Sequence, residues 1–129
     1  MSVMVIDAAA VVDLVCDLPA AGPFRQALVD ASALAAPAHL DAEVISALGR
    51  LERAGRLRPG DERVRALARF PARRWPLRPL LEAAWTLRDR VAVKDALYVA
   101  LAMSLEATLV TTDARLRKAA RALVAVADP

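Results

Sequence analysis

The sequence predicts an α/β domain built around a mostly parallel sheet. Short apolar runs of strand length alternate along the chain with longer segments in which apolar residues repeat at helical spacing. The connections between them are short, as in right-handed crossovers between parallel strands. With 129 residues, 57% of them hydrophobic, the chain is long and apolar enough to bury one core. We therefore expect residues 1–129 to form a single domain.

The first third of the chain predicts two strands and two helices. The apolar run Val3–Ile6 is typical of a buried strand. Apolar residues at helical spacing predict a helix from Ala8 to Val15, and Pro19 ends it. Pro23 suits the first turn of a second helix, and Leu34–Ala36 is expected to be the next strand.

The middle of the chain predicts two further helices and an edge strand. A single apolar stripe predicts a helix from His39 to Ala54. The next helix is expected from Asp61 to Phe70, where Pro71 ends it. Trp75–Leu77 is expected to form an edge strand, because an edge is where a sheet tolerates Pro76.

The last third repeats the same alternation. Helices are expected from Leu80 to Leu87 and from Asp95 to Leu105. The run Thr108–Thr112 predicts a buried strand, after which Asp113 begins another helix. A final strand is expected over Leu123–Val126.

Composition excludes several classes of function. The single cysteine, Cys16, is incompatible with a disulfide framework or a cysteine-based zinc site, and it is expected to pack in the core. Neither of the common glycine-rich phosphate-binding loops is present. The apolar run Ala96–Leu105 is far shorter than the ~18 residues of a membrane-spanning helix, and no basic residue precedes Arg25. We therefore expect a cytoplasmic protein without a membrane segment.

Positive charge is concentrated in the middle of the chain. The net charge is +3, but the segment from Arg50 to Arg78 contains ten arginines and only three acids. Such a segment can bind a polyanion, because neutralised phosphates release their counterions. It can equally be the solvated face of arginine-rich helices. The sequence leaves both interpretations open.

Four acidic residues lie where the predicted fold faces inward. Asp7 and Asp113 follow the two clearest strands, so both lie at the carboxyl edge of the sheet if those strands are parallel neighbours. Asp95 shares the inward stripe of its helix with Tyr98, and Glu43 lies on the apolar face of its own helix. A buried carboxylate needs a partner, a proton or a metal ion.

These acids have two interpretations. Asp7, Asp95 and Asp113 each begin a predicted helix, where aspartate is a favoured cap. Glu43 lies too far into its helix to cap it, and its alternative is an exposed position if the apolar stripe is phased differently. No lysine or arginine shares the stripes of these acids. Hard oxygen ligands at a sheet edge suit Mg²⁺ or Mn²⁺, ions that activate water for attack on a phosphate. Because no histidine or cysteine is a candidate nucleophile, the sequence favours metal-activated water.

Histidine and tryptophan residues carry weaker signals. His39 is expected to lie at the surface or to cap a helix. Trp75 and Trp85 are expected to be packing residues. No aromatic residues alternate with basic ones, so the sequence does not predict a stacking platform for bases.

Four segments together match the pattern of a known family. They are Val5–Ala8, Pro37–Arg50, the string KDALYVALA at Lys94–Ala102 and the string LVTTDARL at Leu109–Leu116. With these segments the chain resembles PIN-domain ribonucleases, and specifically the VapC-like toxins of bacterial toxin–antitoxin pairs. The resemblance covers nearly the whole chain, and its last two strings, at their mutual spacing, are the specific ones.

The resemblance implies a three-layer fold and a particular activity. It implies an endoribonuclease dependent on Mg²⁺ or Mn²⁺ that cuts structured RNA and arrests translation. It also implies a homodimer, and a small antitoxin that wraps the toxin and blocks its acidic site. The acidic quartet of the family corresponds to Asp7, Glu43, Asp95 and Asp113. The three aspartates would bind metal, and Glu43 would be a further ligand or would orient the attacking water.

Two positions depart from the family pattern. A small hydroxyl residue often lies two positions after the first aspartate, where this chain has Ala9, and its loss weakens the support of a metal site. An aromatic residue often precedes the third acid, where this chain has Lys94. Its long side chain can reach the rim of the acidic site, or it can be a solvent-facing lysine at the start of a helix. A PIN-like module that binds RNA or protein without cutting is therefore an alternative. A phospho-acceptor receiver is another, but it would place a second acid beside Asp7, where this chain has Ala8.

Overall fold

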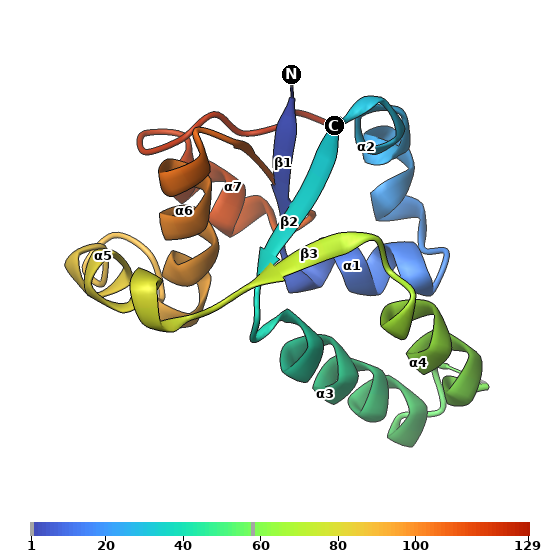
Figure 1. Cartoon of the computed structure of the whole chain (residues 1–129). Helices are drawn as coiled ribbons and strands as arrows, with labels where there is room; N and C mark the ends of the chain where they lie inside the picture. The colour runs from blue at the N-terminus through green and yellow to red at the C-terminus, as the bar shows by residue number, and fades with distance from the viewer. Residues whose placement is uncertain (1, 58) are drawn as a thin grey trace.

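The protein is built around a sheet of four parallel strands (Figure 1). The computed structural model describes residues 2–57 and 59–129. The strands lie in the order β3-β2-β1-β4, with bounds β1 (Val3–Ile6), β2 (Ala33–Pro37), β3 (Ala72–Trp75) and β4 (Thr108–Val110). Because β1 is central, the residues that follow it lie at the middle of the carboxyl edge of the sheet.

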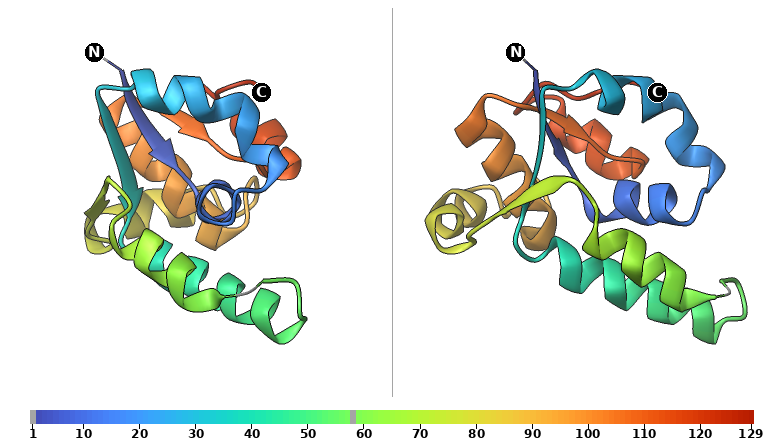
Figure 2. Two further views of the ribbon diagram at one scale, coloured as in Figure 1. Left: turned by 90° about the vertical axis from the view of Figure 1, so that its right-hand side faces the viewer. Right: turned by 45° about the vertical axis from the view of Figure 1, so that its right-hand side comes forward.

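Helices cover both faces of this sheet and extend from its carboxyl edge. Their bounds are α1 (Ala8–Val15), α2 (Arg25–Asp30), α3 (Leu40–Arg53), α4 (Gly60–Ala68), α5 (Leu81–Thr86), α6 (Val93–Leu105) and α7 (Ala114–Ala120), with 3₁₀ turns at Pro19–Phe24 and Arg78–Leu80. Helices α5 and α6 lie on one side of the sheet, and α1 and α2 lie on the other (Figures 1 and 2). The α3–α4 pair lies beyond the carboxyl ends of the strands (Figure 2). The predicted three-layer α/β fold with a parallel sheet is confirmed.

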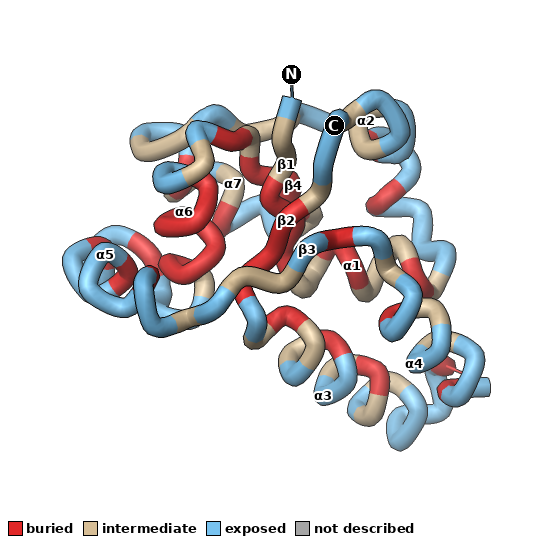
Figure 3. The backbone as a smooth tube through the Cα atoms, in the orientation of Figure 1, coloured by how far each residue is buried: buried red, intermediate tan, exposed pale blue. Residues whose placement is uncertain are grey.

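The core follows from the apolar patterns of the sequence. Helix α6 is apolar all round and buries every residue from Ala96 to Ala102, as a helix packed between a sheet and a neighbouring helix must (Figure 3). Helix α3 instead buries one stripe, formed by Leu40, Val44 and Leu48. None of the helices in the described ranges has the length and apolar character needed to cross a bilayer.

One strand lies three residues earlier than the sequence predicts. The edge strand expected at Trp75–Leu77 is β3 at Ala72–Trp75. Its only neighbour in the sheet, β2, ends at Pro37, which pairs with Trp75. Beyond that pair Pro76 has no N–H to donate, so the ladder stops there.

The last predicted strand is reduced to a single bridge. Within the expected Leu123–Val126 segment, Val126 alone pairs with Leu109 of β4. The Leu109 N–H donates to the Ala125 carbonyl and the Ala127 N–H donates to the Leu109 carbonyl, each at 2.9 Å. Because β4 is only three residues long, it offers little ladder for a further strand.

Several arginines of the basic middle segment hold the fold together. The Arg74 guanidinium donates to both carboxylate oxygens of Asp41 at 3.1 and 2.8 Å and to three backbone carbonyls. Arg63 donates to the Val15 carbonyl at 2.9 Å. The neighbouring Arg73 makes a different contact: its guanidinium stacks on the ring of Trp75, 4.4 Å from the ring centroid. Arg58 lies outside the described residues.

Candidate active site

The carboxylate of Asp7 is buried at the junction of β1 and α1. It caps α1, because its Oδ1 accepts the Ala10 N–H at 2.9 Å. Its Oδ2 accepts the Thr111 hydroxyl at 2.5 Å. Only 3% of Asp7 is exposed, and its side chain has no cationic partner among the described residues. The capping interpretation is therefore correct for Asp7, and it leaves a buried acid without a counter-charge.

Thr111 connects the ends of β1 and β4. Its hydroxyl donates to Asp7 and accepts the Asp113 N–H at 3.0 Å. Asp113 in turn caps α7, since its Oδ1 accepts the N–H groups of Arg115 at 2.9 Å and Leu116 at 3.3 Å. Sequence reasoning overlooked Thr111. Its signal was a hydroxyl residue two positions before an aspartate, directly after a buried strand.

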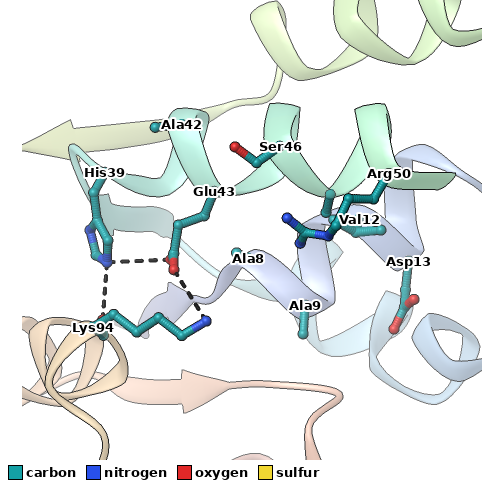
Figure 4. Close-up of a pocket in the computed structure, with 11 residues that line it drawn as sticks. Ala8, Ala9, Val12, Asp13, His39, Ala42, Glu43, Ser46, Arg50 and Lys94 are labelled. Atoms are coloured by element: carbon teal, nitrogen blue, oxygen red, sulfur yellow. Dashed lines mark hydrogen bonds and ion pairs between the residues drawn. The ribbon is translucent and has the colours of Figure 1, made fainter. Parts of the chain in front are cut away.

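Three side chains lie close to the Glu43 carboxylate: His39 at the start of α3, and Lys94 and Tyr98 of α6. The Tyr98 hydroxyl of α6 donates to Glu43 Oε1 at 2.7 Å. His39 Nε2 lies 3.3 Å from the same oxygen, and Lys94 Nζ lies 3.8 Å from Oε2 (Figure 4). The interpretation that Lys94 reaches the rim of the acidic site is confirmed. Its side chain stays 71% exposed, so it is a solvated rather than a buried counter-charge.

His39 is not the surface or capping residue that the sequence predicts. Its side chain is 14% exposed and forms no cap hydrogen bond to α3. Nε2 faces two acceptors, Glu43 Oε1 and the Lys94 carbonyl at 3.0 Å, so Nε2 carries a proton. Nδ1 is buried without a partner among the described residues. Nε2 therefore donates toward Glu43 and the Lys94 carbonyl.

Asp95 lies in the first turn of α6 but does not cap it. The helix begins at Val93, and Asp95 makes no cap hydrogen bond. Burial raises the pKa of Asp95, the nearby Lys94 opposes that shift, and the charges of Glu43 and Asp113 add to it. The capping interpretation is therefore wrong for Asp95.

The four acids interact electrostatically at one edge of the sheet. Burial raises the pKa of Asp7 to about 7, although its hydrogen bonds to Thr111 and Ala10 oppose the shift, and the charges of Asp95 and Asp113 raise it further. Asp95 is influenced by Glu43 in the same way. The carboxylates of Asp7 and Asp95 are thus less stable as anions than they would be in water, and a cation at this edge would relieve both.

Mg²⁺ or Mn²⁺ fits these residues by chemistry. Both ions prefer carboxylate oxygens, and the buried carboxylate of Asp7 lacks a cationic partner. In the conformation that the described residues adopt, no three His, Cys, Asp or Glu side chains stand close enough to share an ion. Glu43 is ion-paired with Lys94, and Asp113 accepts a hydrogen bond from a backbone N–H of the helix that it caps. Binding an ion here therefore requires side chains to turn toward it.

An open cleft of about 610 Å³ lies beside this edge, between α1, α3 and the start of α6. Glu43 is the member of the acidic quartet that lines it, together with His39 and Lys94 (Figure 4). Ala9, the position where the hydroxyl residue is lost, also lines the cleft. Both oxygens of Asp7 already accept hydrogen bonds from Thr111 and the backbone, so Asp7 is oriented without a hydroxyl at residue 9.

Comparison with known proteins agrees with this geometry. The family model described as PIN domain matches residues 4–122. The chain belongs to the PIN domain family. Ribonuclease VapC3 of Mycobacterium tuberculosis is 43% identical over 90% of this chain and 86% of its own length. Ribonuclease VapC12 of the same organism is 39% identical over 88% of each chain. These relatives place the chain among the VapC-like members of the PIN domain family.

A solved structure supports the fold independently. The crystal structure of PAE2754 from Pyrobaculum aerophilum superposes with a TM-score of 0.70, covering 97% of this chain and 83% of that one. At 22% identity this likeness concerns the fold alone. A receiver fold for phosphoryl acceptance is ruled out by membership of the PIN domain family.

Proposed function

We propose that this chain is a PIN-domain endoribonuclease of the VapC type that hydrolyses RNA phosphodiester bonds. The observation that carries the proposal is the acidic edge of the sheet, on a chain 43% identical to Ribonuclease VapC3. There Asp7, Glu43, Asp95 and Asp113 come from four different elements, and the carboxylate of Asp7 is buried without a cationic partner among the described residues. Acids placed at such a cost in stability are typical of a catalytic site.

In this proposal the three aspartates, Asp7, Asp95 and Asp113, hold Mg²⁺ or Mn²⁺. Glu43 is a fourth ligand or orients the attacking water. A bound divalent ion supplies charge stabilisation at the phosphate and a water of lowered pKa. The remaining residues act on the acids: Thr111 and the Ala10 N–H fix Asp7, and Tyr98 and His39 fix Glu43. Lys94 must leave Glu43 or turn toward a phosphate when substrate binds.

Cleavage of a labelled hairpin RNA in Mg²⁺, in Mn²⁺ and in EDTA tests the activity. Wild type should cleave with either ion and not in EDTA. Asp95→Asn and Asp113→Asn should lower the rate at least a hundredfold. The matched control is Asp89→Asn, which removes an exposed acid away from the site and should cleave as wild type does. Cleavage in EDTA, or full activity of both site variants, would contradict the assignment.

A non-catalytic PIN module is the second candidate. The ion pair between Lys94 and Glu43 favours it, because a resident ammonium partly replaces the charge of a metal ion. RNA binding without cleavage in either metal, together with cleavage by Lys94→Tyr, would show that this one residue has silenced the site. Absence of cleavage by both proteins would support a binding role.

We further propose that the chain acts as a cytoplasmic toxin in one domain spanning residues 1–129, as a homodimer held in check by a small antitoxin. The support is the sequence identity of 43% and 39% to two VapC ribonucleases. Light scattering of the purified protein tests the dimer. Growth arrest on expression, relieved by Asp7→Asn, tests the toxin. A monomer in solution or harmless expression of an active nuclease would contradict the respective part.

A further inference from the structure

The cleft between α1 and α3 meets the acidic edge at Glu43. Glu43 belongs to both, because its carboxylate lines the cleft and interacts electrostatically with Asp95. The volume of about 610 Å³ lies within the ~300–1,000 Å³ range of small-ligand sites. A substrate strand whose scissile bond lies at the four acids therefore has room to continue into the cleft.

Two cations project into this cleft from opposite walls. Arg50 comes from the last turns of α3 and Lys94 from the first turn of α6, and both point toward the space beside Glu43 (Figure 4). The Arg50 guanidinium has no ion pair or side-chain hydrogen bond with any residue in the described ranges. Asp13 also lines the cleft, at the end beyond Arg50 (Figure 4). The cleft thus carries one cation without a partner among the described residues, Arg50, and one, Lys94, that would exchange its exposed ion pair with Glu43 for an incoming anion.

The walls between these cations are made of small side chains. Four alanines and a serine line them, Ala8, Ala9, Ala42, Ser46 and Ala47. A backbone of sugar and phosphate can approach such a wall closely, whereas a hydroxyl or larger group at residue 9 would narrow it. This gives the alanine at residue 9 a role in the shape of the cleft.

Resting on the proposed function, we propose that the cleft binds the RNA strand adjoining the bond to be cut, with Arg50 and Lys94 each contacting a backbone phosphate. RNA fits better than an acidic protein segment because the cleft includes Glu43 of the proposed catalytic quartet, so a strand bound at the acids would continue past both cations. Arginine and lysine are both common phosphate ligands.

The test measures binding without cleavage. A fluorescein-labelled hairpin RNA is titrated with protein in EDTA at several salt concentrations, and the logarithm of the affinity is plotted against that of the salt. Arg50→Gln and Lys94→Gln should each reduce the slope by about one, because each removes one phosphate contact. Each should weaken binding about three- to tenfold at moderate salt.

Arg53→Gln is the matched control for Arg50→Gln. It removes the same charge from the same helix, but its guanidinium lies beside Gly49 rather than in the cleft. It should leave the slope unchanged. Equal effects of the Arg50 and Arg53 substitutions would overturn the proposal, since only the overall charge would then matter. Circular dichroism verifies that each variant is folded.

Two further outcomes separate this proposal from the proposed function. If wild type cleaves RNA but the Arg50 and Lys94 variants bind with the wild-type slope, the cleft is not the RNA site and the nuclease assignment stands. If wild type binds RNA through both residues but cleaves in no metal, the cleft stands and the nuclease assignment fails.

A fluorescein-labelled glutamate dodecapeptide tests the identity of the occupant. If it binds more tightly than the RNA and loses affinity in both variants, the occupant is an acidic protein segment and the RNA proposal is wrong.

Discussion

Neutralising the buried carboxylate of Asp7 should stabilise the metal-free protein, and the gain should depend on pH. Burial raises the pKa of Asp7 from 3.8 to about 7 in the folded chain. An acid whose folded pKa is raised binds its proton more tightly in the native state, so the native state loses stability as pH rises from about 4 to about 7. Each pKa unit corresponds to ~1.4 kcal/mol, which makes the whole loss of the order of 4 kcal/mol.

Asp7→Asn removes this loss because an amide does not ionise. Its Oδ1 can still accept the Ala10 N–H, and its amide can donate to the Thr111 hydroxyl oxygen. Urea unfolding in EDTA from pH 4.5 to 8.5 should give similar stabilities at the acid end. The variant should become more stable by up to about 4 kcal/mol above pH 7. In the proposed site the carboxylate of wild type binds Mg²⁺ in the folded state, so Mg²⁺ should close the gap by stabilising wild type.

Asp128 provides a control of opposite sign. It is exposed and its pKa is lowered by Arg121, first through a hydrogen bond and then through charge. Asp128→Asn should therefore lose stability at neutral pH. That loss should stay constant from pH 4.5 to 8.5 and should begin to shrink only when the measurement is extended below about pH 4. A stability gap for Asp7→Asn that does not change with pH would refute the reasoning, because it would show that capping of α1, and not the buried charge, dominates at Asp7.

Three further substitutions test the supports of the site. Tyr98→Phe removes a hydrogen bond to Glu43 worth ~1.5–3 kcal/mol, so kcat for RNA should fall about tenfold or more with KM unchanged, and an unchanged kcat would refute the support. Thr111→Val removes the fully buried hydroxyl that binds Asp7 and should cost ~1–3 kcal/mol in urea unfolding and weaken Mg²⁺ binding measured by calorimetry. Arg74→Lys keeps the positive charge but loses the planar guanidinium, which donates hydrogen bonds to the Asp41 carboxylate and to backbone carbonyls at the same time. It should cost about 2 kcal/mol or more while the cleavage rate per folded molecule stays the same.

Much of the fold was predictable because its elements are locally determined. The strand Val3–Ile6 and the helix from Ala8 to Val15 were predicted with the bounds that the structure gives. The stripe of α3 follows from its helical period alone. β3 was misplaced because Arg73 and Arg74 look like solvated surface, whereas their side chains hold the strand.

The positions of the four acids relative to the sheet were predictable, but their contacts were not. Asp7 and Asp113 could be placed from the strands that precede them. Tyr98 could not be predicted as a partner of Glu43, because the two residues are 55 positions apart and meet only through tertiary packing. His39 is four positions before Glu43, a local spacing from which this contact could have been found. Trp85 was expected to pack, yet it is 59% exposed and lies under the Arg88 guanidinium. Cys16, expected in the core, is only partly buried at its margin.

The parallel pairing of β1 with β4 has a consequence for how the molecule acquires its activity. Thr111 and Asp7 are 104 residues apart in sequence, and the register that joins them sets Met4 beside Thr108. Pairings of such long range form late and slow the folding of a domain. A chain emerging from the ribosome therefore carries Asp7 long before its partner exists. In the proposed toxin, the nascent polypeptide stays harmless until the last strand of the sheet has docked, which separates the synthesis of the protein from the onset of its action.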